Sequence, residues 1–194
     1  MGYDRAETTR RIFDAAVTEF AAAGIAGARI DRIATAARSN KALIYSYFGS
    51  KEQLFAAVLE SRLTGLSEAV TVDPHRVAEY IGDLFDFMTA NTEVLRLVQH
   101  ETCHYLPGTE PHRADREAHY DEKVEAVRSA QHAGNVDPAL DARFVVLSLI
   151  GLVSWFVAAP QITRMVIGAE IDDAIRARYR EHLVLMARRM VQPD

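Results

Sequence analysis

The chain has one cysteine and few residues that interrupt regular structure. Cys103 stands alone among 194 residues, which excludes an internal disulfide and favours a reducing compartment such as the cytoplasm. The six prolines and ten glycines form no repeat and no low-complexity segment. The longest apolar run, residues 144–160, is too short for a membrane span, so we expect no membrane partner. The start, MGYDRAETTRR, is charged and lacks the apolar segment of a signal peptide.

Strand patterns are also missing, because no stretch alternates apolar and polar residues between hairpin turns. Apolar residues instead recur at helical spacing through most of the chain. The expected helices lie near residues 8–23, 30–37, 41–48, 51–70, 74–91, 93–105, 112–133, 141–158 and 171–191, and a further helical turn is expected within 161–167. The sequence therefore predicts an all-α protein of about nine helices. Residues 1–63 form a three-helix head with a helix-turn-helix, and residues 64–194 form a helical bundle.

Charge is distributed unevenly between these two parts. The whole chain has a net charge of −5, which on its own argues against a nucleic-acid binder. Residues 1–63, however, hold nine basic and seven acidic residues, a net of +2, and the remainder has a net of −7. A basic end orients a protein toward phosphates. Because the excess is small, specific contacts must contribute more than the overall field.

Residues 28–51, ARIDRIATAARSNKALIYSYFGSK, contain two short helical patterns separated by a three-residue break. Asn40 is placed to cap the second helix, since its side chain can accept a hydrogen bond from an amide one turn further on. Ser50 is placed to cap the helix that follows in the same way, as part of a capping box with Gln53. In the second pattern the spacing turns Leu43, Ile44 and Phe48 inward. It leaves Lys41, Ala42, Tyr45 and Ser46 outward. Two short helices, a tight turn and an exposed second helix are typical of the helix-turn-helix that reads the DNA major groove, here about residues 29–48.

The same stretch resembles the DNA-binding region of TetR-type transcriptional regulators. The resemblance rests on RIDRIA at 29–34 and NKALIYSYFGSKE at 40–52, and it covers roughly residues 8–60. It implies DNA-contact roles for Arg29, Ser39, Lys41, Tyr45, Tyr47 and Lys51. It also implies an effector pocket enclosed by the helices of the second domain. The chain departs from the family pattern at Arg38, where a glycine is common, and at Ala42, so the operator sequence cannot be predicted.

Side-chain chemistry assigns separate tasks to the exposed residues of this region. Lys41 can donate to guanine or to a phosphate, and Ala42 can offer only a methyl group to thymine. Tyr45 can pack on a thymine methyl group and reach a phosphate. Tyr47 and Lys51 flank the helix as backbone clamps, although Tyr47 could instead pack against the first helix. The predicted DNA-binding residues are Arg29, Ser39, Asn40, Lys41, Ala42, Tyr45, Tyr47 and Lys51.

A second motif points to a different class of protein. Residues 100–104 read HETCH, which matches the zinc-protease pattern H-E-x-x-H: His100 and His104 would share one helix face and Glu101 would act as base. No downstream motif supplies a third ligand. The same residues, with Cys103, could instead hold a metal without catalysis, offer polar groups to an effector pocket, or be ordinary core and surface residues. We expect no enzyme activity and no required cofactor.

The C-terminal part is predicted to form a homodimer and to bind an effector. Residues 144–157 are apolar on nearly all sides, so a second subunit is expected to cover one side of this helix. The predicted interface residues are Leu147, Ile150, Gly151, Ser154, Tyr179, Leu183 and Met186. The predicted pocket for a small apolar or amphipathic effector of unknown identity involves Phe87, Met88, His100, Cys103, His104, Tyr120 and Trp155.

Taken together, these features predict a cytoplasmic, ligand-responsive, dimeric repressor that binds a palindromic operator in double-stranded DNA. A dimer suits the short reading helix, because two copies can read two half-sites about 34–36 Å apart. The alternatives are a zinc-dependent enzyme built on residues 100–104, and a helical interaction protein whose head has lost its DNA-binding role. The exposed Lys41, Tyr45 and Lys51 argue against the latter.

Overall fold

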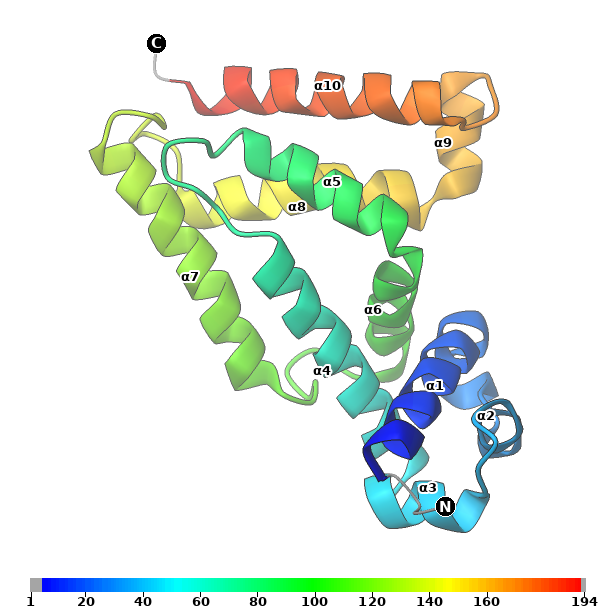
Figure 1. Ribbon diagram of the computed structural model, residues 1–194. Helices are drawn as coiled ribbons and strands as arrows, with labels where there is room; N and C mark the ends of the chain where they lie inside the picture. The colour runs from blue at the N-terminus through cyan, green and yellow to red at the C-terminus, as the bar shows by residue number, and fades with distance from the viewer. Residues whose placement is uncertain (1–4, 193–194) are drawn as a thin grey trace. The chain divides into compact units, whose positions relative to one another are not determined.

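The computed structural model describes residues 5–192, and all regular secondary structure in that range is α-helical (Figure 1). Ten helices follow one another: α1 (Arg5–Gly27), α2 (Ile30–Ala36), α3 (Lys41–Phe48), α4 (Lys51–Ala69), α5 (Glu79–Ala90), α6 (Thr92–His104), α7 (Arg113–His132), α8 (Ala142–Ala158), α9 (Pro160–Ile167) and α10 (Asp173–Val191). The all-α prediction is confirmed. The additional helix is α9, where the sequence predicted only a helical turn. Residues 1–4, part of the charged start, lie outside the described range.

The chain divides into two compact units. The first contains the chain up to Gly65 together with residues 93–113, and the second contains residues 66–92 and the chain from Ala114 onward. The expected boundary after residue 63 lies close to the end of the first segment. No local pattern predicts that residues 93–113, most of α6 and the loop after it, pack with the head. The first unit is therefore built from two separate segments of the chain.

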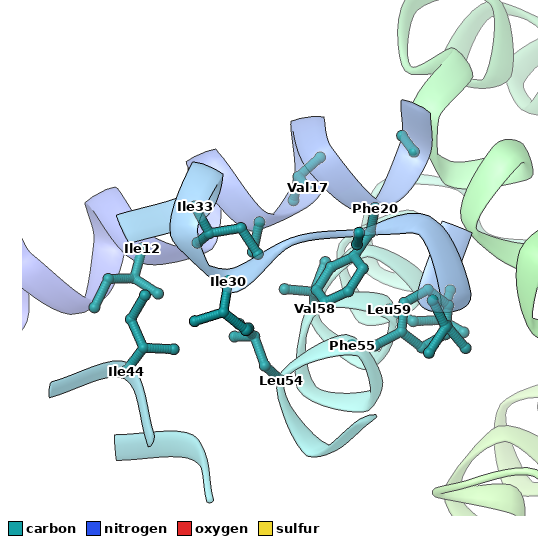
Figure 2. Close-up of a cluster of buried hydrophobic side chains, with 14 of the residues drawn as sticks. Ile12, Val17, Phe20, Ile30, Ile33, Ile44, Leu54, Phe55, Val58 and Leu59 are labelled. Atoms are coloured by element: carbon teal, nitrogen blue, oxygen red, sulfur yellow. The ribbon is translucent and has the colours of Figure 1, made fainter. Parts of the chain in front are cut away.

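The core of the first unit holds the helix-turn-helix in place (Figure 2). Apolar side chains from α1, α2, α3 and α4 meet there, and Leu97 of α6 joins them. The rings of Phe20 and Phe55 pack edge to face with centroids 5.2 Å apart, and both side chains are fully buried. Burial of each such side chain stabilises the fold by roughly 1.5–3 kcal/mol. The labelled residues in Figure 2 are Ile12, Val17, Phe20, Ile30, Ile33, Ile44, Leu54, Phe55, Val58 and Leu59.

Helix α1 does not end at Gly24, as its sequence predicted, but kinks there. Gly24 has φ 66° and ψ −178°, a conformation that glycine adopts readily and other residues avoid. A further helical turn follows to Gly27, because Ile25 is buried and the amide of Ala28 donates to the Gly24 carbonyl at 3.0 Å. The kink thus places one more apolar residue in the head before α2 begins.

In the second unit α5, α8 and α10 pack against one another. Their contact includes a ring cluster. The ring centroids of Phe85 and Phe156 lie 5.1 Å apart, and the ring of Phe156 stacks on that of Tyr179 with centroids 4.5 Å apart. Helix α5 begins at Glu79 and not at residue 74, since Asp73 caps a local turn by accepting from the His75 amide at 2.9 Å. At the other end of the unit, the Gln131 amide donates to the carbonyls of residues 137 and 140 and ties the end of α7 to the loop before α8.

Helix α8 leaves a strongly apolar face uncovered. Leu147 is 66% exposed and Trp155 is 60% exposed, and Gly151 lies between them on the same face. Within residues 5–192 no single helix has the length and hydropathy of a membrane span, and only α8 and α9, bent by 89°, reach them as a pair. Two predicted interface residues, both on α10, pack within the single chain instead: Leu183 is 1% exposed, and Tyr179 lies in the ring cluster. Ile150 and Ser154 are half-buried, and Met186 is exposed.

Candidate nucleic-acid interface

Helices α2 and α3 form the helix-turn-helix, and local hydrogen bonds fix the turn between them. The Ser39 amide donates to the Ala34 carbonyl at 2.9 Å, which closes α2. Asn40 then caps α3, because its side-chain oxygen accepts from the Leu43 amide at 2.8 Å, as predicted. Arg38 occupies the left-handed region with φ 50°. That conformation explains why a glycine suits this position, and it strains the turn slightly.

Helix α3 presents a short outward face. Ile44 is buried at 1% exposure and anchors the helix on the head core. Lys41, Ala42 and Tyr45 are exposed, and Tyr45 exposes 46% of its surface. These three residues span the first turn and a half of α3, the part of a recognition helix that contacts base edges. The structure therefore brings the predicted base-reading residues together on one surface.

Lys41 is not a free charge in this arrangement. Its ammonium group forms an ion pair with the carboxylate of Asp31 in the first turn of α2, and both side chains remain about half exposed. The pair orients Lys41 and partly neutralises it before any DNA is bound. The sequence offered no simple sign of this pairing, because the two residues are ten positions apart and meet only through the turn.

Arg29 and Ser39 take structural positions at the ends of α2. The Arg29 amide donates to the Glu19 carboxylate at 2.9 Å, which satisfies the amide just before α2, and α2 has no side-chain cap at this end. The Arg29 side chain is exposed and remains available for a phosphate. The Ser39 hydroxyl oxygen is buried and has no hydrogen-bond partner among residues 5–192, so it does not point into solvent.

Lys51 lies at the start of α4 and faces the end of α1. Its ammonium group approaches the carbonyls of Ala26 and Ala28 at 3.5 and 3.4 Å, so it caps the last turn of α1. Ser50 caps α4 by accepting from the Gln53 amide at 3.1 Å, as predicted. A hydrogen bond to its own backbone amide lowers the pKa of Glu52, and Ser50 and Lys51 act in the same direction. The start of α4 favours an anion, and the carboxylate of Glu52 already occupies its own amide there.

Tyr47 packs on the head core, and its predicted role as a backbone clamp stays a prediction. Its ring is half-buried and packs against the head core, where it meets Phe48 edge-on at 6.3 Å. Its outer face is covered by the guanidinium of Arg5, whose central carbon lies 4.9 Å from the ring centroid. Arg5 was not among the predicted DNA-binding residues, since a lone arginine at the start of a long helix carries no motif.

The HETCH segment serves the packing of α6 on the head. The His100 ring lies against Gly24 at the kink of α1, with Nε2 3.4 Å from the Ala21 carbonyl. Glu101 is buried at 4% exposure, whereas Cys103 and His104 are exposed. Within the described part of the chain these residues do not converge as a group of three metal donors. His100 is thus a contact between two helices of the first unit.

The residues predicted for the effector pocket are divided between the two units. His100, Cys103 and His104 belong to the first unit, and Phe87, Met88, Tyr120 and Trp155 belong to the second. Met88 is buried and Phe87 half-buried, but Tyr120 and Trp155 are exposed in the single chain.

The second unit also contains interior polar groups that the sequence did not reveal. Burial raises the pKa of Tyr80, and the nearby Tyr120 raises it further. Burial lowers the pKa of Lys123, whose ammonium group has the Ser67 hydroxyl at 3.5 Å. A groove of about 440 Å³ lies elsewhere in this unit, where Tyr179 and His182 of α10 face Ile167 of α9. Polar groups inside an apolar helical unit are suited to orient a small amphipathic ligand.

Two family models match the chain. The model described as "Bacterial regulatory proteins, tetR family" matches residues 12–58, and the model "Tetracyclin repressor-like, C-terminal domain" matches residues 76–189. The first covers the helix-turn-helix and the helices that support it. The second covers nearly all of the second unit. It also covers α6, which lies between the two segments of that unit in the sequence.

Similar proteins and structures extend over almost the whole chain. An HTH-type transcriptional repressor of Streptomyces coelicolor, SCO4008, is 44% identical over 188 residues, which are 97% of each protein. The crystal structure of the putative transcriptional regulator SCO4942 from the same species superposes with a TM-score of 0.84 at 36% identity, covering 96% of this chain and 99% of that one. The fold is also shared with the regulator FadR of Bacillus subtilis, solved with stearoyl-CoA: TM-score 0.75, 16% identity, covering 95% of this chain and all of that one.

Proposed function

The chain belongs to the TetR family of bacterial regulatory proteins and is a DNA-binding transcriptional regulator; from that premise we propose that it acts as a dimeric repressor whose hold on a palindromic operator is released by a small effector. The single observation that supports DNA reading most directly is the outward face of α3. Lys41, Ala42 and Tyr45 lie there side by side on a helix anchored by Ile44.

Repression and a cytoplasmic site of action are proposed from the relative at 44% identity, which carries the name of a transcriptional repressor. A repressor acts where the chromosome is, and a chain with one exposed cysteine suits a reducing compartment. The chemistry of the proposed DNA contacts does not depend on the sign of regulation, since a bound dimer can either block or recruit polymerase.

Dimerisation is proposed from the uncovered face of α8. Phe144, Leu147 and Trp155 are each at least 60% exposed, and their spacing of three and eight residues places them along one side of the helix. Exposed apolar surface of this kind marks an interaction site. A second copy is the occupant that the DNA chemistry requires, because one α3 of eight residues gives few base contacts and a two-fold pair doubles them.

Effector response is proposed as a population shift. An effector held in the second unit stabilises a dimer geometry in which the two α3 helices no longer match the half-site spacing, so the DNA-bound population falls. The half-buried Lys123 and the buried Tyr80 supply polar contacts to a ligand that is otherwise surrounded by apolar side chains. We therefore propose a small apolar or amphipathic effector and no required cofactor.

The experiment that tests this function is a titration of a selected operator with purified protein, followed by fluorescence anisotropy at several salt concentrations. We expect two chains per operator and an affinity that falls steeply with salt. Lys41→Ala and Tyr45→Phe weaken binding, while Arg128→Ala, which removes an exposed charge from α7 in the second unit, leaves it unchanged. Equal affinity for operator and unrelated DNA in all variants would overturn the proposal.

A further inference from the structure

The guanidinium of Arg5 rests on the ring of Tyr47, and this contact joins the first residue of α1 to the last turn of the recognition helix. The distance from the Arg5 central carbon to the ring centroid is 4.9 Å, within the range of a cation–π contact. Figure 1 shows the start of α1 beside α3 in the same unit. A positive group is therefore fixed against α3, the helix that carries Lys41 and Tyr45.

The ring of Tyr47 is a firm support for this arginine. It is half-buried against the head core and meets Phe48 edge-on. Phe48 in turn lies 5.4 Å from Phe13 of α1, so the aromatic chain returns to the helix that carries Arg5. Because the ring cannot turn freely, the guanidinium that covers it has a defined position, and little side-chain entropy remains to be lost when it binds a ligand.

Arg5 also retains its full charge and its hydrogen-bond donors. Among residues 5–192 no carboxylate pairs with Arg5, whereas Arg10, one and a half turns along α1, pairs with both Glu7 and Asp14. A guanidinium stacked on a ring keeps its N–H groups free in its own plane, and that fork matches the oxygens of a phosphate. Arg5 is therefore ready to bind an anion in a way that Arg10 is not.

The surroundings of Arg5 suit a phosphate as well. Arg5 lines a groove of about 760 Å³ in the first unit, and the cations Arg10 and Arg62 and the hydroxyl-bearing residues Thr9 and Ser61 line it too. The wall includes Phe13 and the single acid Asp14, which lies 3.9 Å from Arg62. Basic and hydroxyl groups of this kind suit the phosphates of a DNA backbone, and contacts to phosphates do not depend on base sequence.

We propose that Arg5, positioned by the ring of Tyr47, binds a backbone phosphate beside the bases read by α3, and that Tyr47 serves the interface chiefly by holding this arginine. The proposal rests on the proposed function, because it presumes that α3 lies in the major groove. It adds a contact that is independent of base sequence. Each dimer contains two such contacts, one at each half-site.

The test is a salt titration of DNA affinity with six variants, the control included. Neutralising one phosphate contact per subunit lowers the slope of log affinity against log salt by about 0.9 for each contact, so Arg5→Ala should reduce the slope by about 1.8 per dimer. The loss should be equal on the operator and on scrambled DNA. Arg128→Ala, which removes an exposed and ion-paired arginine from α7 in the second unit, is the control and should leave the slope unchanged. Arg5→Lys keeps the positive charge and should retain the slope.

Two substitutions separate the role of the Tyr47 ring from that of its hydroxyl group. Tyr47→Phe keeps the stacking face, and Tyr47→Leu removes it. We expect Tyr47→Phe to bind as the unmodified protein does. Tyr47→Leu should match Arg5→Ala, and the double variant should be no weaker than either alone. An unchanged slope in Arg5→Ala, or an equal change in Arg128→Ala, overturns the phosphate contact. Additive losses overturn the positioning role. If Tyr47→Leu does not fold, Arg5→Ala and Arg128→Ala still decide the contact.

These outcomes remain distinct from failure of the proposed function. If the unmodified protein shows no preference for any selected DNA, the regulator proposal fails before Arg5 is considered. If it binds an operator with a steep salt dependence and Arg5→Ala does the same, only the inference about Arg5 fails.

Discussion

Lys41 of the recognition helix is ion-paired with Asp31 of the preceding helix, so the lysine best placed to contact DNA is partly neutralised in the free protein. Binding to a base or phosphate must compete with this pair. Asp31→Asn should therefore raise DNA affinity roughly two- to five-fold at low salt, the equivalent of a surface ion pair of about 0.4–1 kcal/mol. Fluorescence anisotropy with the operator measures the change.

The matched control for this prediction is Asp83→Asn, which removes the same charge from α5 in the second unit, where it pairs with Arg180. It should leave operator affinity unaltered. If Asp31→Asn weakens binding while the protein remains folded by circular dichroism, the pair prepares Lys41 for DNA and does not compete with it.

Arg38 holds a left-handed conformation that a glycine would adopt without strain. Arg38→Gly should raise the free energy of unfolding by about 1 kcal/mol. A non-glycine residue in the left-handed region costs roughly 1–2 kcal/mol, and the greater flexibility of glycine in the unfolded chain offsets part of the gain. In a chain of this length the melting temperature should rise by about 2–4 °C. Arg38→Ala removes the same charge but keeps the strain, so a similar rise in both variants would show that charge, not backbone conformation, is responsible.

Gly24 is needed both for its backbone angle and for the space beside it. A Cβ at Gly24 would lie 2.8 Å from Nδ1 of His100, and φ is +66°. Gly24→Ala should lower the free energy of unfolding by about 1–3 kcal/mol through backbone strain, with a further loss from displacing the His100 ring. Chemical denaturation measures this change in the free energy of unfolding.

Gly65 provides the contrast within the same unit. It lies inside α4, and nothing is within 4 Å of a Cβ built there. Gly65→Ala should therefore stabilise the protein by about 0.5–1 kcal/mol. A loss of stability in Gly65→Ala comparable to that in Gly24→Ala would contradict the special position of Gly24.

The apolar face of α8 predicts how the protein dissociates. Leu147→Glu introduces a charge on a side chain that is 66% exposed in the single chain, so it should not disturb folding but should convert the dimer to a monomer at micromolar concentration. Operator binding should weaken at least ten-fold, because each monomer then holds only one half-site. Sedimentation velocity follows the association state.

Leu106→Glu is the control for this variant, since Leu106 is also a leucine, is 75% exposed, and lies in the first unit after α6. It should remain dimeric. A Leu147→Glu protein that sediments as a dimer would mean that the face of α8 has another occupant.

The sequence predicted what depends on neighbouring residues and missed what depends on the tertiary fold. Asn40 and Ser50 cap their helices as predicted, because a cap needs only an amide one turn away. The outward face of α3 followed from helical periodicity. The pairing of Lys41 with Asp31 and the packing of His100 on Gly24 join residues from different helices, and no local pattern encodes them.

The prediction was weakest where burial decides a role. Leu183 was placed in the dimer interface because its helix is amphipathic, yet it is buried within the single chain. The apolar stripe of α10 serves its packing on α5 and α8. Of the seven residues predicted for the effector pocket, three belong to the first compact unit, and their assignment to one pocket stays a prediction. Hydropathy identifies apolar surface but not what covers it.

Selection of bound sequences from random double-stranded DNA by the purified protein tests whether a two-fold dimer reads DNA through α3. We expect enrichment of an inverted repeat whose two half-sites are centred about 34–36 Å apart along the helix axis or a multiple of that distance. Lys41→Ala should lose enrichment at specific positions in both half-sites. Absence of any enriched sequence, or enrichment of a single site without symmetry, would contradict a two-fold dimer that reads DNA through α3.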